Sequence, residues 1–233
     1  MKPTVLLGAT TTPDGKRMEL LAHDRDRIIR VGGTELMSTR QHFSEDRLGA
    51  IAVAGLGGVR RPRVLVGGLG MGFTLRAVLA GLPADGAVTV AELIPAVVAW
   101  NRDPSLGLAA DCLADPRVSV VEGDVADLLA SSPVAFDAVL MDVDNGTGAL
   151  TTAGNRRLYR AAGVGLVRGA LRPRGLAVWW SAHEDRAFEA LVAGGGFDVT
   201  VERVLPHAGA KRATHVLFVG RLASPRFPAR PSP

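Results

Sequence analysis

The sequence predicts an α/β protein in which a doubly wound, mostly parallel seven-stranded sheet follows a small N-terminal β domain. From residue 63 onward, short apolar runs alternate with helical segments, and this alternation requires a mostly parallel sheet with helices on both faces. Before that point, apolar runs are separated by short polar turns, as in an antiparallel meander. Because 47% of the 233 residues are hydrophobic and the net charge is only +4, the chain can bury a core.

The N-terminal β domain is expected over residues 1–43. Its predicted strands are 18–22, 27–31 and 34–39, separated by the polar turn 23–26 and by Gly32-Gly33. A helix and a linker follow over residues 44–62. Ser44 is the expected N-cap, acids in the first turn favour the positive end of the helix dipole, and the helix runs to about Gly55.

The main domain is expected over residues 63–223. Its predicted strands are 64–66, 87–91, 118–121, 138–141, 176–180, 197–204 and 214–219, with the last strand antiparallel. Its predicted helices are 73–82, 95–101, 125–130, 155–171 and 184–192. Residues 224–233 hold four prolines, and we expect this tail to be disordered.

A glycine cluster gives the sharpest functional signal. Gly68, Gly70 and Gly72 form a G-x-G-x-G pattern directly after a predicted strand and before a predicted helix. Glycine there lets the backbone turn tightly and lets a ligand approach closely. Phe73 stands where the dinucleotide pattern needs its third glycine, so the spacing favours a nucleoside over a pyrophosphate. The alternative is a tight strand–helix turn that binds nothing.

Acidic residues follow the next three predicted strands. Glu92 ends one strand, where an acid can accept hydrogen bonds from ribose hydroxyls or can simply be solvated. Asp124 follows the next strand and could bind the amine of adenine or cap the following helix. Asp142 and Asp144 follow the strand after that. The carboxyl ends of parallel strands form the edge at which open α/β sheets bind ligands, so we expect a binding site there.

Together these motifs resemble those of the class I S-adenosylmethionine-dependent transferases, and within them those of the spermidine synthase (polyamine aminopropyltransferase) family. The resemblance runs from about Ser38 to Leu222. The matching motifs are Gly68 to Gly72 with Thr74-Leu75-Arg76, Glu92 with Pro95, Asp115-Pro116-Arg117-Val118, Gly123-Asp124, and Leu171-Arg172-Pro173-Arg174-Gly175.

The resemblance implies a Rossmann-like class I methyltransferase fold and a homodimer, with an N-terminal β domain that helps to form the dimer and covers the substrate. The implied donor is S-adenosylmethionine or decarboxylated S-adenosylmethionine, no metal is implied, and the implied acceptor is a small molecule, usually an amine. The residues expected at the nucleoside are Gly68, Gly70, Met71, Gly72, Glu92, Asp124 and Val125. The residues expected at the transferred carbon are Asp142, Asp144 and Asn145.

Two departures from the family pattern bear on the function. Met71 stands where the family has an Asp that binds the amino group of the donor. Asn145 stands where a second Asp helps to deprotonate the attacking amine, and Asp144 either replaces it or only forms a turn. Losing both carboxylates argues for a changed donor, such as S-adenosylmethionine itself, or for a changed acceptor. Three functions therefore stay open: an aminopropyltransferase, a methyltransferase or other alkyltransferase, and a non-catalytic nucleoside-binding protein.

The acceptor side is expected to involve Gln41, His42, Glu45 and Trp180. The family carries a Tyr-His-Glu stretch at a helix start, and only Glu45 matches it well. His42 could be a general base, since its ordinary pKa lies near neutrality, or a partly exposed capping residue. Trp179 and Trp180 should point to opposite faces of their strand, with Trp180 either walling the site or packing in the core.

The remaining composition argues against other classes of function. The pI is about 10, which suggests nucleic-acid binding, but the arginines scatter and do not interleave with the eleven aromatic residues. We therefore expect no nucleic-acid partner, although Arg156, Arg157 and Arg160 could meet an anionic acceptor. The five histidines lack metal-ligand spacing. One cysteine fits a reducing cytoplasm, and no apolar stretch is long enough for a bilayer, so we expect a soluble, cytoplasmic protein without a membrane partner.

Overall fold

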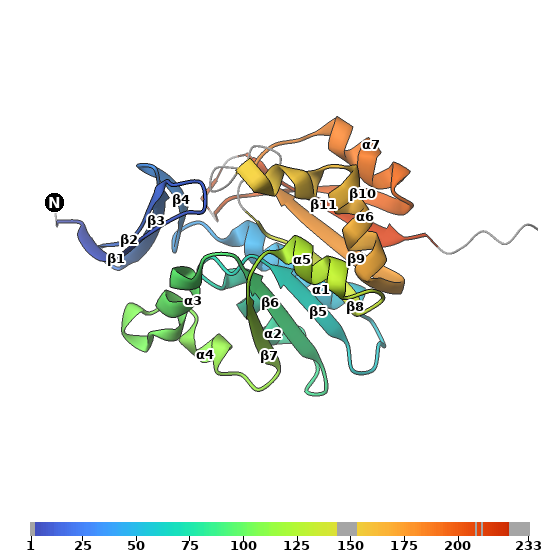
Figure 1. Cartoon of the computed structure of the whole chain (residues 1–233), viewed down its shortest axis with the longest axis horizontal. Helices are drawn as coiled ribbons and strands as arrows, with labels where there is room; N and C mark the ends of the chain where they lie inside the picture. The colour runs from blue at the N-terminus through green and yellow to red at the C-terminus, as the bar shows by residue number, and fades with distance from the viewer. Residues whose placement is uncertain (1–2, 144–152, 208, 211, 224–233) are drawn as a thin grey trace, which may run out of the picture.

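The structure is a computed structural model that describes residues 3–143, 153–207, 209–210 and 212–223. It has two parts: an N-terminal antiparallel sheet, at the left in Figure 1, and a larger α/β unit. The N-terminal sheet has the order β1-β2-β3-β4. Its strands are β1 (Val5–Thr11), β2 (Arg17–His23), β3 (Asp26–Val31) and β4 (Thr34–Ser38).

Strand β1 was not predicted, because its apolar residues do not alternate with polar ones. The strand lies at the edge of the sheet, and Val5 and Leu6 are both about half exposed, at 52% and 49%. Further along, a Cβ on Gly8 would lie 2.5 Å from the indole nitrogen of Trp100, so β1 packs closely against the larger unit.

The large sheet confirms the predicted class, with seven strands in the order β10-β11-β9-β8-β5-β6-β7. Its strands are β5 (Arg63–Gly67), β6 (Ala87–Glu92), β7 (Val118–Glu122), β8 (Phe136–Met141), β9 (Leu171–Ser181), β10 (Phe197–Val204) and β11 (His215–Leu222). The pairs among β5 to β9 are parallel, and β11 is antiparallel to both β9 and β10. The antiparallel final strand is therefore confirmed.

Helices cover both faces of this sheet (Figure 1). The α-helices are α1 (Phe43–Gly55), α2 (Phe73–Gly81), α3 (Pro95–Arg102), α4 (Ala110–Leu113), α5 (Val125–Ser131), α6 (Ala161–Ala170) and α7 (Arg186–Gly194). Two short 3₁₀ segments are η1 (Pro104–Leu106) and η3 (Ala153–Tyr159). Among the described helices, none is long and apolar enough to cross a membrane.

Three local predictions were wrong. The single helix over 155–171 is instead η3 followed by α6, because Arg160 is extended and a Cβ on Gly163 would overlap the backbone of Leu158. The helix expected from residue 184 starts at Arg186, with the Asp185 carboxylate accepting from the Phe188 N–H at 2.9 Å. The third concerns Ser44, which does not cap α1.

His42 is the N-cap residue of α1, and Ser44 lies inside the helix, fully buried. The Ser44 hydroxyl is engaged with side chains of Glu45 and His215 instead of the helix N-terminus.

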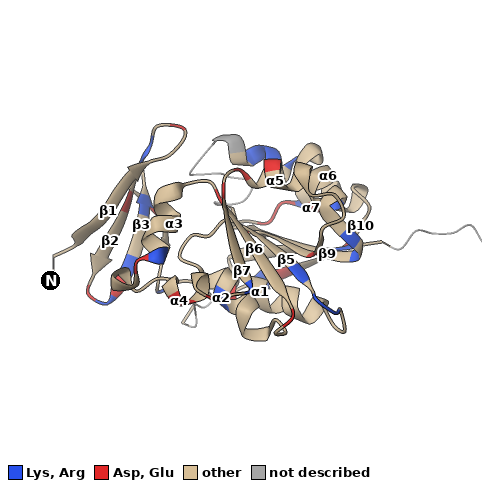
Figure 2. Ribbon diagram, turned by 60° about the horizontal axis from the view of Figure 1, so that its bottom comes forward, with Lys and Arg blue, Asp and Glu red and all other residues tan. Residues whose placement is uncertain are grey.

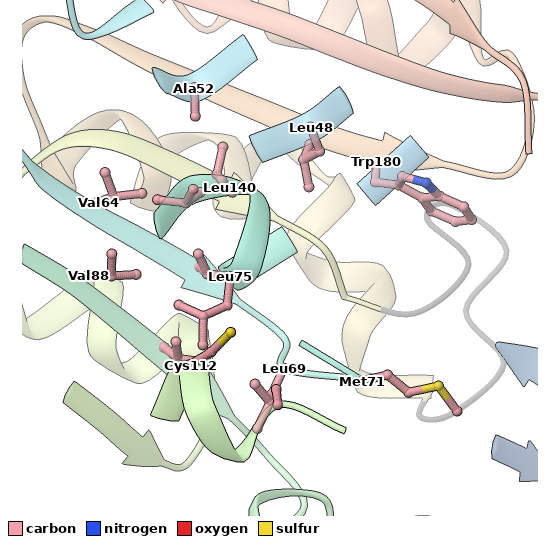
Figure 3. Packing of buried hydrophobic residues seen from close by; sticks show 14 of the residues in the cluster. Leu48, Ala52, Val64, Leu69, Met71, Leu75, Val88, Cys112, Leu140 and Trp180 are labelled. Atoms are coloured by element: carbon pink, nitrogen blue, oxygen red, sulfur yellow. The ribbon is translucent and has the colours of Figure 1, made fainter. Parts of the chain in front are cut away.

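Alternate residues of each central strand belong to two hydrophobic clusters, one on each face of the sheet. One cluster joins Val64 and Leu140 of the sheet to Leu48 of α1 and Leu75 of α2 (Figure 3). This cluster continues into the N-terminal sheet through Met18, Leu20, Ile29 and Val31. Trp180 belongs to this cluster and Trp179 to the opposite one, which confirms that the two indoles face opposite sides.

Candidate active site

Strand register brings the predicted loop residues to one edge of the large sheet. Gly67 of β5 pairs with Ala91 of β6 and with Met141 of β8, so the residues that follow these positions end at the same level. The residue directly after β5, Gly68, has φ +92°, and a Cβ there would lie 2.2 Å from the carbonyl oxygen of Asp142. Glycine is therefore needed here for the close contact between the loop after β5 and the loop after β8, even without a bound ligand.

A cavity of about 440 Å³ opens at this edge, between the large sheet and the N-terminal sheet. The N-terminal sheet contributes part of the wall, including Met18, Ile29 and Met37. Five carboxylates line the cavity: Glu35, Glu45, Glu92, Asp124 and Asp142. Among the described lining residues there is no Lys or Arg, although the chain carries a net charge of +4. The cavity is thus acidic inside a basic protein.

Most of the residues predicted for the site line this cavity. They are Gly68, Gly70, Glu92, Asp124, Val125, Asp142, Gln41, Glu45 and Trp180. Three others lie elsewhere: Met71 is buried in the core, Gly72 is the N-cap residue of α2, and His42 is the N-cap residue of α1. Asp144 and Asn145 lie outside the described residues.

Glu92 holds the two neighbouring loops together. Its carboxylate accepts from the Leu69 N–H at 2.8 Å and from the Ile94 N–H at 2.9 Å. Burial raises the pKa of Glu92, and the backbone hydrogen bonds oppose that shift. Each carboxylate oxygen has a second lone pair. The same side chain can therefore brace the glycine loop and accept a hydroxyl from a ligand.

Asp124 caps α5, which was one of the two roles predicted for it. Its carboxylate accepts from the Ala126 N–H at 2.8 Å and also from the guanidinium of Arg157. Arg157 was a candidate for an anionic acceptor, but in the structure it partly neutralises Asp124. Because Asp124 also lines the cavity, a contact with a base amine remains a prediction alongside the cap.

Glu45, which is buried, and Asp142, which is half-buried, both lie in the cavity wall. Asp142 accepts from the Thr74 hydroxyl at 2.6 Å, and burial raises its pKa to about 6. Glu45 is 7% exposed, and burial together with the negative charge of Asp142 raises its pKa to about 7. Like charges in a poorly solvated wall destabilise each other, so this pair favours a bound proton or a bound cation.

His215 and Ser38 are two of the cavity-lining residues that were not predicted from the sequence. His215, at the start of β11, lines the cavity and lies 2.8 Å through Nδ1 from the Ser44 hydroxyl. Ser38, at the end of β4, is 1% exposed. Its hydroxyl and the indole N–H of Trp180, another lining residue, have no hydrogen-bond partner among the described residues. A buried polar group without a partner is costly, and a ligand would supply one.

His42 and Met71 have structural environments that explain their positions. The His42 ring lies 2.7 Å through Nδ1 from the Asp46 carboxylate and stacks on Phe73, with ring centroids 4.3 Å apart. Met71 is 2% exposed, within the same hydrophobic cluster as Leu69 (Figure 3). Among the described residues, no group of three or more His, Cys, Asp or Glu could hold a metal ion.

The fold is similar to that of several solved structures. No protein-family model and no curated protein sequence matches the chain. A spermidine synthase from Thermotoga maritima matches with a TM-score of 0.73 and 15% identity, over 94% of this chain and 73% of its own.

Two further solved structures have a similar fold. A spermidine synthase in complex with the transition-state analogue AdoDATO has a TM-score of 0.72 and 14% identity, over 94% of this chain and 72% of its own. A probable spermidine synthase from Corynebacterium glutamicum has a TM-score of 0.64 and 20% identity, over 92% and 79%. The chain has a Rossmann-like class I methyltransferase fold. More particularly, it has the spermidine synthase-like form of that fold, with the N-terminal β sheet in place.

Proposed function

We propose that the chain transfers an alkyl group, aminopropyl or a related one, from an S-adenosylmethionine-type sulfonium donor to an amine acceptor. The observation that carries this proposal is the acidic cavity at the carboxyl edge of a spermidine synthase-like sheet. A sulfonium ion and an ammonium ion are both cations, and five carboxylates without a described Lys or Arg in the wall suit two cationic ligands.

The cavity divides into two regions in this proposal. The loops that carry Gly68, Glu92 and Asp124 would hold the nucleoside, with Glu92 on the ribose hydroxyls. Glu45 and Asp142 would lie near the transferred carbon and the amine. The sulfonium is already activated, so the protein needs mainly to align the amine lone pair with the carbon and to accept one proton. The roles proposed for Asp144 and Asn145 in the same region stay predictions.

Two observations bear on the identity of the donor. A spermidine synthase of similar fold is described in complex with the transition-state analogue AdoDATO, which favours decarboxylated S-adenosylmethionine here. The family's carboxylate is absent at Met71, and this loss of negative charge favours a changed donor, such as S-adenosylmethionine with its own carboxylate, and hence methyl transfer. Methyl transfer to a small molecule is therefore the second candidate function.

Calorimetric titration separates these candidates. We expect wild-type protein to bind one of the two donors, S-adenosylmethionine or its decarboxylated form, at least tenfold more tightly than the other. Preference for the decarboxylated donor, followed by transfer to a diamine, supports aminopropyl transfer, and preference for the carboxylated donor supports methyl transfer. If neither donor binds, the proposal fails. Asp198→Asn, at an exposed position of β10, is a control that should bind the donor as wild type does.

Three further expectations belong to this proposal. The single cysteine supports a cytoplasmic location, and the family resemblance supports a homodimer. The acidic wall makes nucleic acid an unsuitable substrate, since a polyanion would be repelled. Sedimentation at micromolar protein concentration tests the dimer directly.

A further inference from the structure

A chain of polar side chains leads from the cavity into the protein. Ser44 is fully buried, and its hydroxyl donates to Glu45 Oε2 at 2.5 Å. The same oxygen lies 2.8 Å from Nδ1 of His215, which begins β11 and is 171 residues away in the sequence. Both His215 and Glu45 line the cavity. The serine thus connects an imidazole and a carboxylate in the same wall.

When Glu45 is ionised, the number of protons on these groups fixes the tautomer of the histidine. A serine hydroxyl has one proton, and an ionised carboxylate can only accept. When Ser44 donates to Glu45, its oxygen is left to accept, so Nδ1 of His215 must carry a proton and donate. A neutral ring then has its free lone pair at Nε2. Among the described residues, this nitrogen has no hydrogen-bond partner.

The surroundings keep the ring neutral and hold its plane. Burial lowers the pKa of His215, and the nearby His183 lowers it further, so the unprotonated form dominates at neutral pH. The Trp180 indole meets the ring at 64°, with centroids 4.8 Å apart. The Tyr159 hydroxyl donates to the backbone carbonyl of Trp180 at 3.0 Å and so holds the backbone of Trp180 in place.

We propose that His215 is the catalytic base that takes the proton of the acceptor amine at Nε2, and that Ser44 and Glu45 are positioning residues that hold the ring in the required tautomer. This inference rests on the proposed function, since it names the base for that reaction. The proposal also supplies a base for a chain that has Asn145, and therefore no carboxylate, at the position where the family has its base.

The step balances with one proton. The acceptor enters as an ammonium ion and gives one proton to Nε2, which leaves a free amine and an imidazolium. The amine lone pair then forms a bond to the alkyl carbon while the carbon–sulfur bond breaks, and that electron pair stays on sulfur. The products are a neutral thioether nucleoside and a secondary ammonium ion. No oxidant, reductant or metal is needed.

The proton on the imidazolium has a path away from the substrate. The Nδ1 proton can pass to the Ser44 oxygen while the serine proton passes to Glu45. The pKa of Glu45 is raised to about 7, so its carboxylate can accept a proton near neutral pH.

Other charges around His215 are few or paired. Asp142 faces the same cavity, and His183 follows β9. On β10, which pairs with β11, Glu202 is held by Arg47 and Arg203 is held by Glu184. Glu45 and Asp142 thus share the cavity wall with His215, and His183 lowers the pKa of His215.

The test compares His215→Gln with His23→Gln, a control that removes an imidazole of β2 outside the cavity wall. Single-turnover transfer is measured with saturating donor and a diamine across pH 5 to 9, and donor affinity is measured by calorimetry. We expect His215→Gln to slow transfer by roughly 10²- to 10⁴-fold with donor affinity within threefold of wild type, and to lose the acid limb of the rate profile. His23→Gln should transfer within threefold of wild type, with an unchanged pH profile.

A second variant tests the positioning role. Ser44→Ala should slow transfer by about tenfold, the effect of one lost hydrogen bond. It should also change the ¹⁵N shifts of His215 from the Nδ1–H tautomer to a mixture, which a purely packing role would not do. A wild-type ring protonated on Nε2 at neutral pH would overturn the tautomer assignment, whatever the activity.

The outcomes separate the two proposals. If wild type transfers and His215→Gln transfers within threefold with an unchanged pH profile, the histidine assignment is wrong and the proposed function stands. If wild type binds neither donor nor transfers to any amine, the proposed function fails and the base assignment falls with it.

Discussion

Glu45 shows how a single side chain can be costly to the fold and useful to the site. It lies in the first turn of α1, where a carboxylate ordinarily stabilises a helix, but it is buried beside Asp142. Burial and the neighbouring charge raise its pKa to about 7. The folded protein therefore holds the Glu45 proton more tightly than the unfolded chain does, and ionising this group costs stability.

This predicts a pH dependence of stability that one substitution should remove. The Glu45 contribution is fully present below pH about 4.5 and is lost as the pH rises to about 7, on the order of 3 kcal/mol in all. Glu45→Gln keeps the size and an oxygen that can accept from Ser44. Urea unfolding at pH 5 and pH 8 should show the variant gaining stability relative to wild type at pH 8. Parallel pH curves for the two proteins would contradict the buried, proton-holding state of Glu45.

At the scale of elements, the glycine loop between β5 and α2 depends on the close approach of the β8 loop. Gly68→Ala places a Cβ 2.2 Å from the Asp142 carbonyl oxygen, at a φ of +92° that alanine rarely adopts. We expect a loss of at least about 2 kcal/mol in the free energy of unfolding, together with weaker donor binding. The measurement is the urea midpoint and slope.

Gly165→Ala is the matched control for that substitution. Gly165 lies in α6 with no atom within 4 Å of the added Cβ, so the same change should leave stability equal or raise it by up to about 1 kcal/mol. Equal losses at both positions would mean that the contact between Gly68 and the β8 loop does not determine stability.

The elements also show which parts of the structure could be predicted from the sequence. The strands of the large sheet and the edge at which their loops meet were predictable, because apolar runs and glycines are local signals. The division between η3 and α6 was not, since it depends on the close packing of Gly163 on Leu158. The acids at Glu92 and Asp142 were found because they follow strands. His215 was missed, because its partner Ser44 is 171 residues away and no local pattern connects them.

At the scale of the whole molecule, the distribution of charge separates the surface from the cavity. Basic residues lie on both the N-terminal sheet and the larger unit, and several are next to acidic ones (Figure 2). Most of the described ion pairs, such as Arg76 with Asp111 and Arg47 with Glu202, are on the surface. Within the described part of the chain, the carboxylates of the cavity wall form no such ion pair, apart from Asp124 with Arg157.

The N-terminal sheet contributes to this acidic wall through Glu35 of β4, which is the basis of a last prediction. Glu35→Gln should raise the KM for a diamine acceptor by about two- to fivefold, because it removes one solvent-exposed charge from the wall. The affinity for the donor nucleoside should stay the same. The effect should shrink as salt rises, since exposed charges are screened within about 8 Å at physiological ionic strength.

Glu19→Gln provides the control on the same sheet. Glu19 and Glu35 are both cross-strand neighbours of Arg30, but only Glu35 lines the cavity. If the N-terminal sheet acts on the acceptor through charge, Glu35→Gln alone should change the KM, and the change should be larger at low salt. An equal change in the KM of both variants would instead mean that removing a cross-strand neighbour of Arg30 disturbs the sheet. The N-terminal sheet would then affect the acceptor through the shape of the cavity wall and not through its charge.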